Sequence, residues 1–206
     1  MRVEVIFPTL VGIEIVDKTL CMSATDEIKK MASNNDIVSD DAGLCISTPD
    51  NLDQRPEFAS LYKDITSKVN IYASEVLGLE ENNLMCSGMW ANIHNKFSTH
   101  HYHQHANSYI SGVLFLDIPE CKAPGEFVFV DPRNAKTMSY GDYKSGSEVA
   151  NNTYCLMPKT GALLLFPSWL PHGTNPFIPD SDSKRYSLSF NYSLTSCSQP
   201  TMKIRK

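Results

Sequence analysis

The first part of the chain has a hydrophobic pattern that predicts one strand followed by two helices. Residues 2–16 alternate between apolar and polar side chains and are rich in β-branched residues, which is typical of a strand. Residues 24–33 follow Ser23, a residue type that often caps helix N-termini, and predict a short helix. The run from Pro56 to Gly78 has apolar residues at helical spacing and predicts a second, longer helix. We therefore expect a helical support over about residues 20–80.

From residue 85 onward the pattern changes to short apolar runs separated by turn residues, which predicts strands. No long helical pattern lies between these runs to make parallel crossovers, so we expect antiparallel strands. The runs cover residues 88–94, 108–116, 126–130, 153–158, 162–166 and 186–194. The expected fold class is mainly β with N-terminal helices. Its core is a double-stranded β-helix, a jelly-roll or cupin-like fold, over about residues 85–195 of a single domain spanning 1–206.

Two polar segments interrupt this pattern. Residues 34–55 are dense in Asn, Asp, Ser and Gly and predict a loop. Residues 133–152 are also polar and are long for a connection, so they form either a lid over a site or a disordered excursion. The sequence Asp131-Pro132-Arg133 at the start of this segment predicts a turn with a local ion pair.

Composition and charge narrow the class of protein. The formal net charge of −5 argues against a nucleic-acid binder, which usually presents a basic face. No apolar stretch approaches the roughly 18 residues of a membrane span. The N-terminus lacks the basic and apolar regions of a signal peptide, so we expect a cytoplasmic protein. The six cysteines contain no CxxC pair and are expected to be reduced thiols.

Histidines are the strongest chemical signal in the sequence. Five of the six fall within residues 94–105, and the sixth, His172, follows an apolar run and a turn bounded by prolines. A metal site needs ligands that converge from several chain segments, and these two regions can supply them.

The spacing within the cluster leaves the choice of ligands open. Alternate residues of a strand point to the same face, so His103 and His105 can bind a metal ion together, and so can His101 and His103. In this register His100 faces the other way. The alternative is a solvent-exposed, histidine-rich loop with no ligand role.

Arg185 begins an alternating strand thirteen residues after His172. An arginine inside a β-barrel would need an anionic partner, because an unpaired buried charge is costly. Ser187 lies two residues further on and therefore on the same strand face. The strand thus predicts a site for an anion near the histidines.

These residues resemble the 2-oxoglutarate- and Fe(II)-dependent oxygenase superfamily, in which a histidine-x-carboxylate pair, a later histidine and a following arginine bind iron and the distal carboxylate of 2-oxoglutarate. More narrowly, the chain is similar to the “putative 2OG-Fe(II) oxygenase” branch, which has members in phages and marine bacteria. The motifs that carry the resemblance span nearly the whole chain: Ile6-Phe7-Pro8-Thr9, Trp90-Ala91-Asn92, His103-x-His105, Ser111-Gly112-Val113, Asp131-Pro132-Arg133, Phe166-Pro167-Ser168-Trp169 with His172, and Arg185 to Asn191.

The resemblance implies a dioxygenase that hydroxylates an unidentified substrate and releases succinate and carbon dioxide. Its Fe(II) would be held by His103, His105 and His172. Its 2-oxoglutarate would be held by Arg185, with Ser187 as a hydroxyl donor. Five further residues are candidates for the pocket lining, although ordinary core packing explains each of them as well: Trp90, Asn92, Tyr109, Trp169 and Asn191.

One departure from the family pattern is that His105 stands where the family has a carboxylate, so the ligand set becomes three histidines. Four acidic residues are candidates for the missing ligand: Asp117, Glu120, Glu126 and Asp131. Two alternatives to the family activity remain. One is a cupin-type three-histidine dioxygenase that does not use 2-oxoglutarate, and the other is a non-catalytic metal-binding module of the same fold. Arg185 favours the 2-oxoglutarate enzyme, because a three-histidine dioxygenase needs no buried guanidinium there.

The substrate is not specified by the sequence, and both a small molecule and a protein remain open. We expect no nucleic-acid partner and no membrane association. The oligomeric state is open, with a homodimer among the options. The expected compartment is the cytoplasm, which would be that of the host if a phage encodes the protein.

Overall fold

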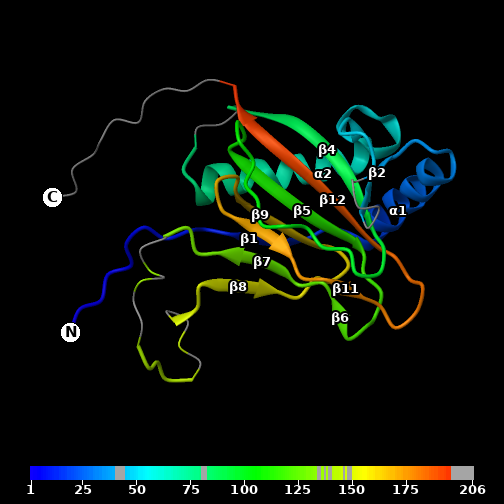
Figure 1. Ribbon diagram of the computed structural model, residues 1–206. Coiled ribbons are helices and arrows are strands. Elements are labelled where there is room, and N and C mark those ends of the chain that lie inside the picture. Colours follow the sequence, from blue (N-terminus) through cyan, green and yellow to red (C-terminus); the bar gives the residue numbers. More distant parts are fainter. Residues whose placement is uncertain are drawn as a thin grey trace.

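The computed structural model describes residues 1–39, 45–79, 83–133, 136, 138, 141–145, 147 and 150–195 (Figure 1). Its framework is a seven-stranded sheet with the strand order β1-β9-β5-β12-β4-β3-β2, in which all neighbouring strands are antiparallel. The strands of this large sheet are β1 (Gly12–Ile15), β2 (Val38–Ser39), β3 (Cys45–Ser47), β4 (Leu84–His94), β5 (Ile110–Asp117), β9 (Ala162–Pro167) and β12 (Arg185–Leu194).

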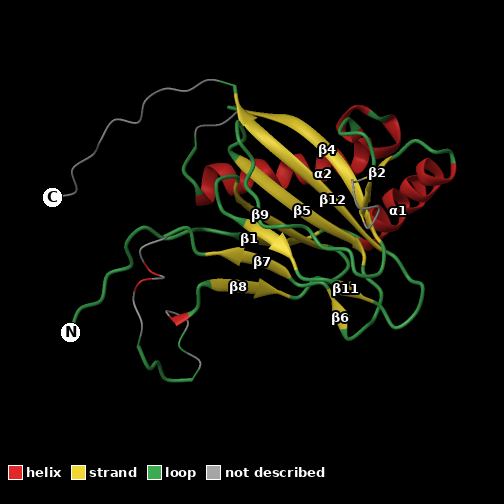
Figure 2. Ribbon diagram, in the orientation of Figure 1, coloured by secondary structure: helices red, strands yellow, loops and turns green. Residues whose placement is uncertain are grey.

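A smaller sheet with the strand order β10-β7-β8 lies on the other side of the large sheet from the helices (Figure 2). A two-stranded ribbon, β11-β6, accompanies it. Their strands are β6 (Ala123–Pro124), β7 (Phe127–Val130), β8 (Thr153–Leu156), β10 (His172–Thr174) and β11 (Phe177–Ile178). An apolar cluster joins the two sheets, with Phe115 and Phe166 from the large sheet and Phe127 and Phe129 from the small one. The predicted jelly-roll fold is confirmed.

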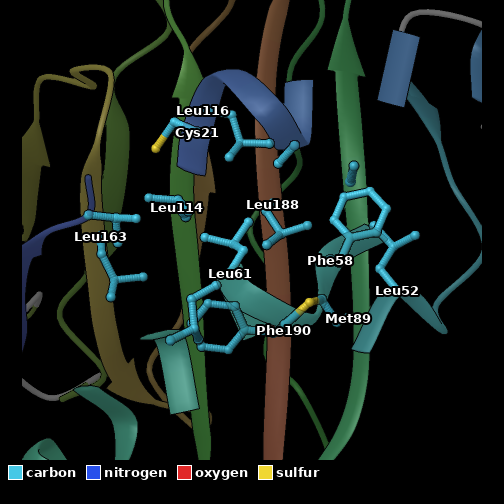
Figure 3. Packing of buried hydrophobic residues seen from close by; sticks show 14 of the residues in the cluster. Cys21, Leu52, Phe58, Leu61, Met89, Leu114, Leu116, Leu163, Leu188 and Phe190 are labelled. Carbon is cyan, nitrogen blue, oxygen red and sulfur yellow. The ribbon is translucent and has the colours of Figure 1, made fainter. Parts of the chain in front are cut away.

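Helices cover the opposite face of the large sheet. They are α1 (Lys18–Ser33) and α2 (Ala59–Ile71), with short helical turns η1 (Leu52–Gln54), η2 (Pro56–Phe58) and η3 (Tyr72–Val76) flanking α2. Figure 3 shows Leu61 of α2 packed over Leu188 and Phe190 of β12, all of them almost fully buried. Burying one such side chain contributes about 1.5–3 kcal/mol, so this layer is a main source of stability.

Two N-terminal elements differ from the prediction. Helix α1 begins at Lys18 and not at Ala24, because the side chain of Asp17 accepts a hydrogen bond from the Thr19 backbone N–H (2.7 Å) and caps the helix there. The strand predicted over residues 2–16 is restricted to β1, since only Gly12–Ile15 pairs with β9. The predicted helix from Pro56 to Gly78 is confirmed as the continuous run η2, α2 and η3.

The central strands carry apolar side chains on one face and polar side chains on the other. Along β12, the residues that face the helices are Tyr186, Leu188, Phe190 and Tyr192. The intervening residues that face the small sheet and line a cavity are Arg185, Ser187 and Ser189. This alternation places polar groups between two sheets, where ordinary packing would favour apolar ones.

Four sequence-based expectations concern other parts of the chain. Arg133 and Asp131 form the predicted local ion pair (2.7 Å). The segment predicted as a lid, residues 133–152, falls largely outside the described residues. Among the described helices, none has the length and apolar character to cross a membrane. The described cysteines, which take part in no disulfide, are Cys21, Cys45, Cys86, Cys121 and Cys155.

Candidate active site

A cavity of about 240 Å³ lies between the two sheets. The large sheet contributes residues of β3, β4, β5, β9 and β12, the small sheet contributes residues of β7 and β10, and the segment before β5 adds a third wall. No aspartate or glutamate is among the described residues that line it. Its ionisable lining is one guanidinium and four imidazoles, from Arg185, His100, His103, His105 and His172. This donor set suits a metal ion together with an anion.

Three of these histidines converge at one end of the cavity. The candidate ligand atoms of His103, His105 and His172 all lie within 4.8 Å of one another. The Nε2 atoms of His105 and His172 are 3.2 Å apart. Imidazole nitrogens bind first-row metal ions at about 2.1 Å, which places two ligands on adjacent coordination positions about 3 Å apart. The spacing of this pair therefore fits a single metal ion.

Backbone pairing between two distant segments brings the three rings together. His103 N donates to His172 O (2.9 Å) and His172 N donates to His103 O (3.1 Å), which joins the segment of His103 to β10. His105 N donates to Ser168 O (3.1 Å). The segment from His103 to His105 belongs to neither sheet. The isolated bridge between His103 and His172 brings these rings together, where a regular strand was expected to do so.

Hydrogen bonds to the second ring nitrogen orient two of the three rings. His103 Nδ1 lies 2.7 Å from the carbonyl oxygen of His101, and His172 Nδ1 lies 2.8 Å from that of Leu170. A carbonyl oxygen can only accept, so in both rings Nδ1 carries the proton and Nε2 keeps the lone pair that a metal needs. Burial lowers the pKa of His172 to about 3 and that of His105 to about 4, which keeps both rings in the neutral form.

The structure reverses the expected roles of His100 and His101. His100 lines the cavity, whereas His101 is exposed. The chain bends at Tyr102, so the alternation that relates His103 to His105 does not extend back to His101. The inward position of His100 is one that the sequence pattern did not indicate.

The acidic residues considered as alternative ligands lie elsewhere. Asp131 pairs with Arg133 (2.7 Å) and Lys136 (3.1 Å), and Glu126 accepts from Asn175 Nδ2 (3.1 Å). Neither of these, nor Asp117 nor Glu120, lines the cavity. Among the described residues, the group formed by His103, His105 and His172 therefore contains no carboxylate.

The other residues expected in the pocket are divided between the cavity and the surface. Trp90 and Asn92 line the cavity, and Asn191 contacts His105 from β12. Tyr109 and Trp169 do not line it and are 40% and 52% exposed. Trp169 lies in the tight turn between β9 and β10, and Tyr109 lies just before β5, so neither belongs to the strand faces that enclose the cavity.

Arg185 lies in the same cavity and is 1% exposed. Its Nη1 donates to the carbonyl oxygens of Pro124 (2.9 Å) and Gly125 (2.6 Å), which hold the guanidinium in place. Its Nε is buried and has no acceptor among the described residues. None of the described carboxylates is within ion-pair distance of it.

This burial lowers the pKa of Arg185 to about 10, so the group remains cationic at neutral pH. A buried charge without a counter-ion is strongly unfavourable. The cavity therefore requires an anion at this end, and Ser187 Oγ lies on the same strand face as a further hydrogen-bond donor.

A family model agrees with this geometry. Residues 88–191, slightly more than half of the chain, match the family described as “Putative 2OG-Fe(II) oxygenase”. The chain belongs to the 2OG-Fe(II) oxygenase family. It is therefore an oxidoreductase of the 2-oxoglutarate-dependent dioxygenase class, with Fe(II) and 2-oxoglutarate as its cofactors, as the sequence predicted. The matched residues include all three clustered histidines and Arg185.

Several solved structures share the fold. HygX from Streptomyces hygroscopicus with nickel and 2-oxoglutarate bound is similar with a TM-score of 0.65 and 16% identity over 91% of this chain and 84% of that chain. A Pseudomonas putida prolyl-4-hydroxylase is similar with a TM-score of 0.64 and 12% identity, over 90% of this chain and 93% of that chain. The 2-oxoglutarate-dependent epimerase SnoN from nogalamycin biosynthesis is similar with a TM-score of 0.65 and 14% identity, over 90% of this chain and 78% of that chain. No curated protein matches the chain. At these identities the structural likeness shows the fold alone.

Proposed function

We propose that this 2OG-Fe(II) oxygenase hydroxylates a C–H bond of its substrate and converts 2-oxoglutarate to succinate and carbon dioxide. One observation carries the proposal: a single cavity is lined by three converging imidazoles and by a buried guanidinium that has no counter-ion among the described residues. The first feature fits a metal ion and the second fits the distal carboxylate of a dicarboxylate.

In this proposal His103, His105 and His172 hold Fe(II) through their Nε2 atoms. Three neutral ligands leave the double positive charge of the ion uncompensated, so the site favours a dianionic cosubstrate over a neutral one. When bound, iron and 2-oxoglutarate together supply the oxidising chemistry, and the protein supplies binding, orientation and a dry cavity.

Arg185 and Ser187 would bind and orient the cosubstrate. A guanidinium pairs with a carboxylate through two parallel hydrogen bonds, which fixes direction as well as distance. Nη1 of Arg185 already donates to the carbonyl oxygens of Pro124 and Gly125. The edge of the guanidinium that contains Nε, which has no partner among the described residues, is therefore the one that can bind the carboxylate. Lysine would not serve this role equally, because it offers a point charge in place of a planar pair of donors.

Aromatic residues form a water-poor wall beside the metal group. The ring of Phe127 stacks on His172 with centroids 5.6 Å apart, and the ring of Phe166 meets the same imidazole edge-on at 4.6 Å. Apolar rings on this side limit the number of water molecules that reach the ligands. Charge interactions inside the cavity are stronger as a result.

The proposal is tested by following iron content and succinate formation together. Wild-type protein loaded anaerobically with Fe(II) should form succinate when 2-oxoglutarate and oxygen are added, slowly even without the substrate. The His172→Ala variant should lose iron and form no succinate. The His101→Ala variant is the matched control, because His101 is exposed and contributes no ring to the group, and it should keep both.

Two results would contradict the proposal. Unchanged iron content in His172→Ala would remove His172 from the metal site. Iron-loaded wild type that neither binds 2-oxoglutarate nor forms succinate would exclude the 2-oxoglutarate-dependent reaction in favour of a three-histidine dioxygenase or a non-catalytic module.

A further inference from the structure

A second group of metal-binding side chains lies next to the Arg185 end of the cavity. Cys45, His94 and His100 place candidate ligand atoms within 4.8 Å of one another. They come from three segments, namely β3, the last residue of β4 and the loop that follows β4. Cys45 and His94 are directly paired across β3 and β4 and are 1% and 0% exposed, while His100 is half-buried. Three donors of metal-binding type therefore meet at one point inside the protein.

We propose that Cys45, His94 and His100 form a second metal site, separate from the three-histidine group, that takes a soft divalent cation such as Zn²⁺. Thiolate and imidazole are the ligands that Zn²⁺ prefers, whereas Mg²⁺ and Ca²⁺ require oxygen ligands. Zinc distances of about 2.3 Å to sulfur and 2.0–2.1 Å to nitrogen place tetrahedral ligands roughly 3.3–3.6 Å apart. The three candidate ligand atoms lie within 4.8 Å of one another, so binding of the ion would draw them closer together.

His94 is held in the orientation that a ligand needs. Its Nδ1 lies 2.8 Å from the hydroxyl oxygen of Ser98, a fully buried side chain. When this hydroxyl accepts the Nδ1 proton, Nε2 keeps its lone pair, which is the second-shell arrangement of metal-bound histidines. On the opposite side of the ring, Nε2 lies 3.5 Å from Ser187 Oγ. This contact is too long to compete with a metal bond. Burial holds the pKa of His94 well below its ordinary value, so the ring is neutral.

The two metal groups share no side chain, and the His100 ring of the second group lies beside the His103 ring of the first. The ring centroid of His100 is 4.9 Å from that of His94 and 6.4 Å from that of His103. His100 also lines the cavity, which gives a cation a route to the buried Cys45 and His94. The second site is therefore accessible without unfolding of the sheet.

Charge sets the conditions under which the second site fills. Arg185 is paired with His94 across β12 and β4, so its positive charge opposes a neighbouring cation. When the metal binds, the Cys45 thiol releases its proton to solvent. The resulting thiolate binds the metal and offsets one of its positive charges. A carboxylate bound to Arg185 would offset another. We therefore expect 2-oxoglutarate to tighten cation binding at this site, and this coupling alone rests on the proposed function.

The test is titration of Co(II) into the full-length protein, followed by absorption. Only the second site contains sulfur, so a thiolate-to-cobalt charge-transfer band reports on it and not on the three-histidine group. Wild type should develop this band and bind two Co(II) ions per chain. The Cys45→Ser variant should lose the band and bind one. The Cys86→Ser variant is the matched control, because Cys86 lies on β4 of the same sheet and outside the group, and it should keep the band.

A second variant keeps the test decisive if Cys45→Ser does not fold. His100→Ala removes a half-buried ring, and it should weaken formation of the band at least tenfold. A wild type without the band, or a band that Cys45→Ser and His100→Ala both retain, would overturn the second site. Arg185→Ala should keep the band while losing 2-oxoglutarate binding, so failure of the cosubstrate site and failure of the second metal site give different results.

Discussion

Asn191 reaches from β12 to the ring of His105, with its Nδ2 3.3 Å from His105 Nδ1. Its Oδ1 accepts from Ser111 Oγ at 2.7 Å. A metal ion on Nε2 of His105 requires the proton to be on Nδ1, and a half-turn of the Asn191 amide presents its oxygen as the acceptor for that proton. Backbone carbonyls perform this role for His103 and His172, so Asn191 is the side chain that completes the set.

We therefore predict that Asn191→Ala lowers the Fe(II) affinity by about 10- to 100-fold, the usual effect of losing such a partner. Asn191→Asp should preserve the affinity, because a carboxylate also accepts from Nδ1. The measurement is anaerobic metal titration by calorimetry. Asn92→Ala serves as the control, since Asn92 lies on the same face of the sheet but bonds to Ser47 (3.0 Å) and Ser189 (3.0 Å). Equal affinities for wild type and Asn191→Ala would exclude a positioning role for Asn191.

Gly125 lies against the guanidinium of Arg185. A Cβ atom at this position would be 2.5 Å from Arg185 Nη1 and 2.9 Å from Asn175 O, and the residue has a positive φ of 75°. Gly125→Ala should therefore displace Arg185 and weaken 2-oxoglutarate binding at least tenfold, or about 1.4 kcal/mol, with Fe(II) binding unchanged. Binding of 2-oxoglutarate to the iron-loaded protein measures this.

Gly78→Ala is the matched control for Gly125→Ala. Gly78 has a similar positive φ of 68°, but nothing lies within 4 Å of an added Cβ. Both substitutions carry the backbone cost of about 1–2 kcal/mol, whereas only Gly125→Ala disturbs Arg185. Similar 2-oxoglutarate affinities in the two variants would show that Gly125 has no special relationship to Arg185.

The sequence predicts most of the fold because long, regular helices and strands have a clear periodic pattern of hydrophobic residues. The alternation from Tyr186 to Leu194 identifies β12, and the helical spacing after Pro56 identifies α2. Short elements carry no such signal. Strand β3 consists of Cys45–Ser47 inside a segment whose composition predicts a loop, and it is a strand because it pairs with β4.

The candidate site was predictable only in part, for the same reason. His103, His105, His172 and Arg185 occur in motifs with recognisable spacing. The inward position of His100 depends on a bend at Tyr102 that no periodicity reports. The approach of Cys45 to His94 depends on the register between β3 and β4, which is a long-range property.

Gly112 provides a test of packing in the large sheet. A Cβ atom there would lie 2.3 Å from Phe190 Cζ and 2.9 Å from the carbonyl oxygen of Leu164. Gly112→Ala should therefore lower the free energy of unfolding by about 1–3 kcal/mol. Gly88→Ala is the control on a neighbouring region of the same sheet, where the nearest atom is at 3.7 Å, and it should be nearly neutral. Urea unfolding measures both, and equal midpoints would show that the Phe190 ring can move aside without cost.

The central claim is that Arg185 supplies the counter-charge for 2-oxoglutarate while the histidines hold the iron. Its most direct test is anaerobic titration of 2-oxoglutarate into Fe(II)-loaded wild type, Arg185→Ala and Arg185→Lys, followed by the metal-to-ligand charge-transfer absorption. Arg133→Ala, which removes an exposed arginine paired with Asp131, is the control. Losing a buried charge pair costs about 2–5 kcal/mol, so Arg185→Ala should retain iron and bind 2-oxoglutarate roughly 30-fold to several thousand-fold more weakly, with partial recovery in Arg185→Lys. Equal 2-oxoglutarate affinity in wild type and Arg185→Ala would contradict the account.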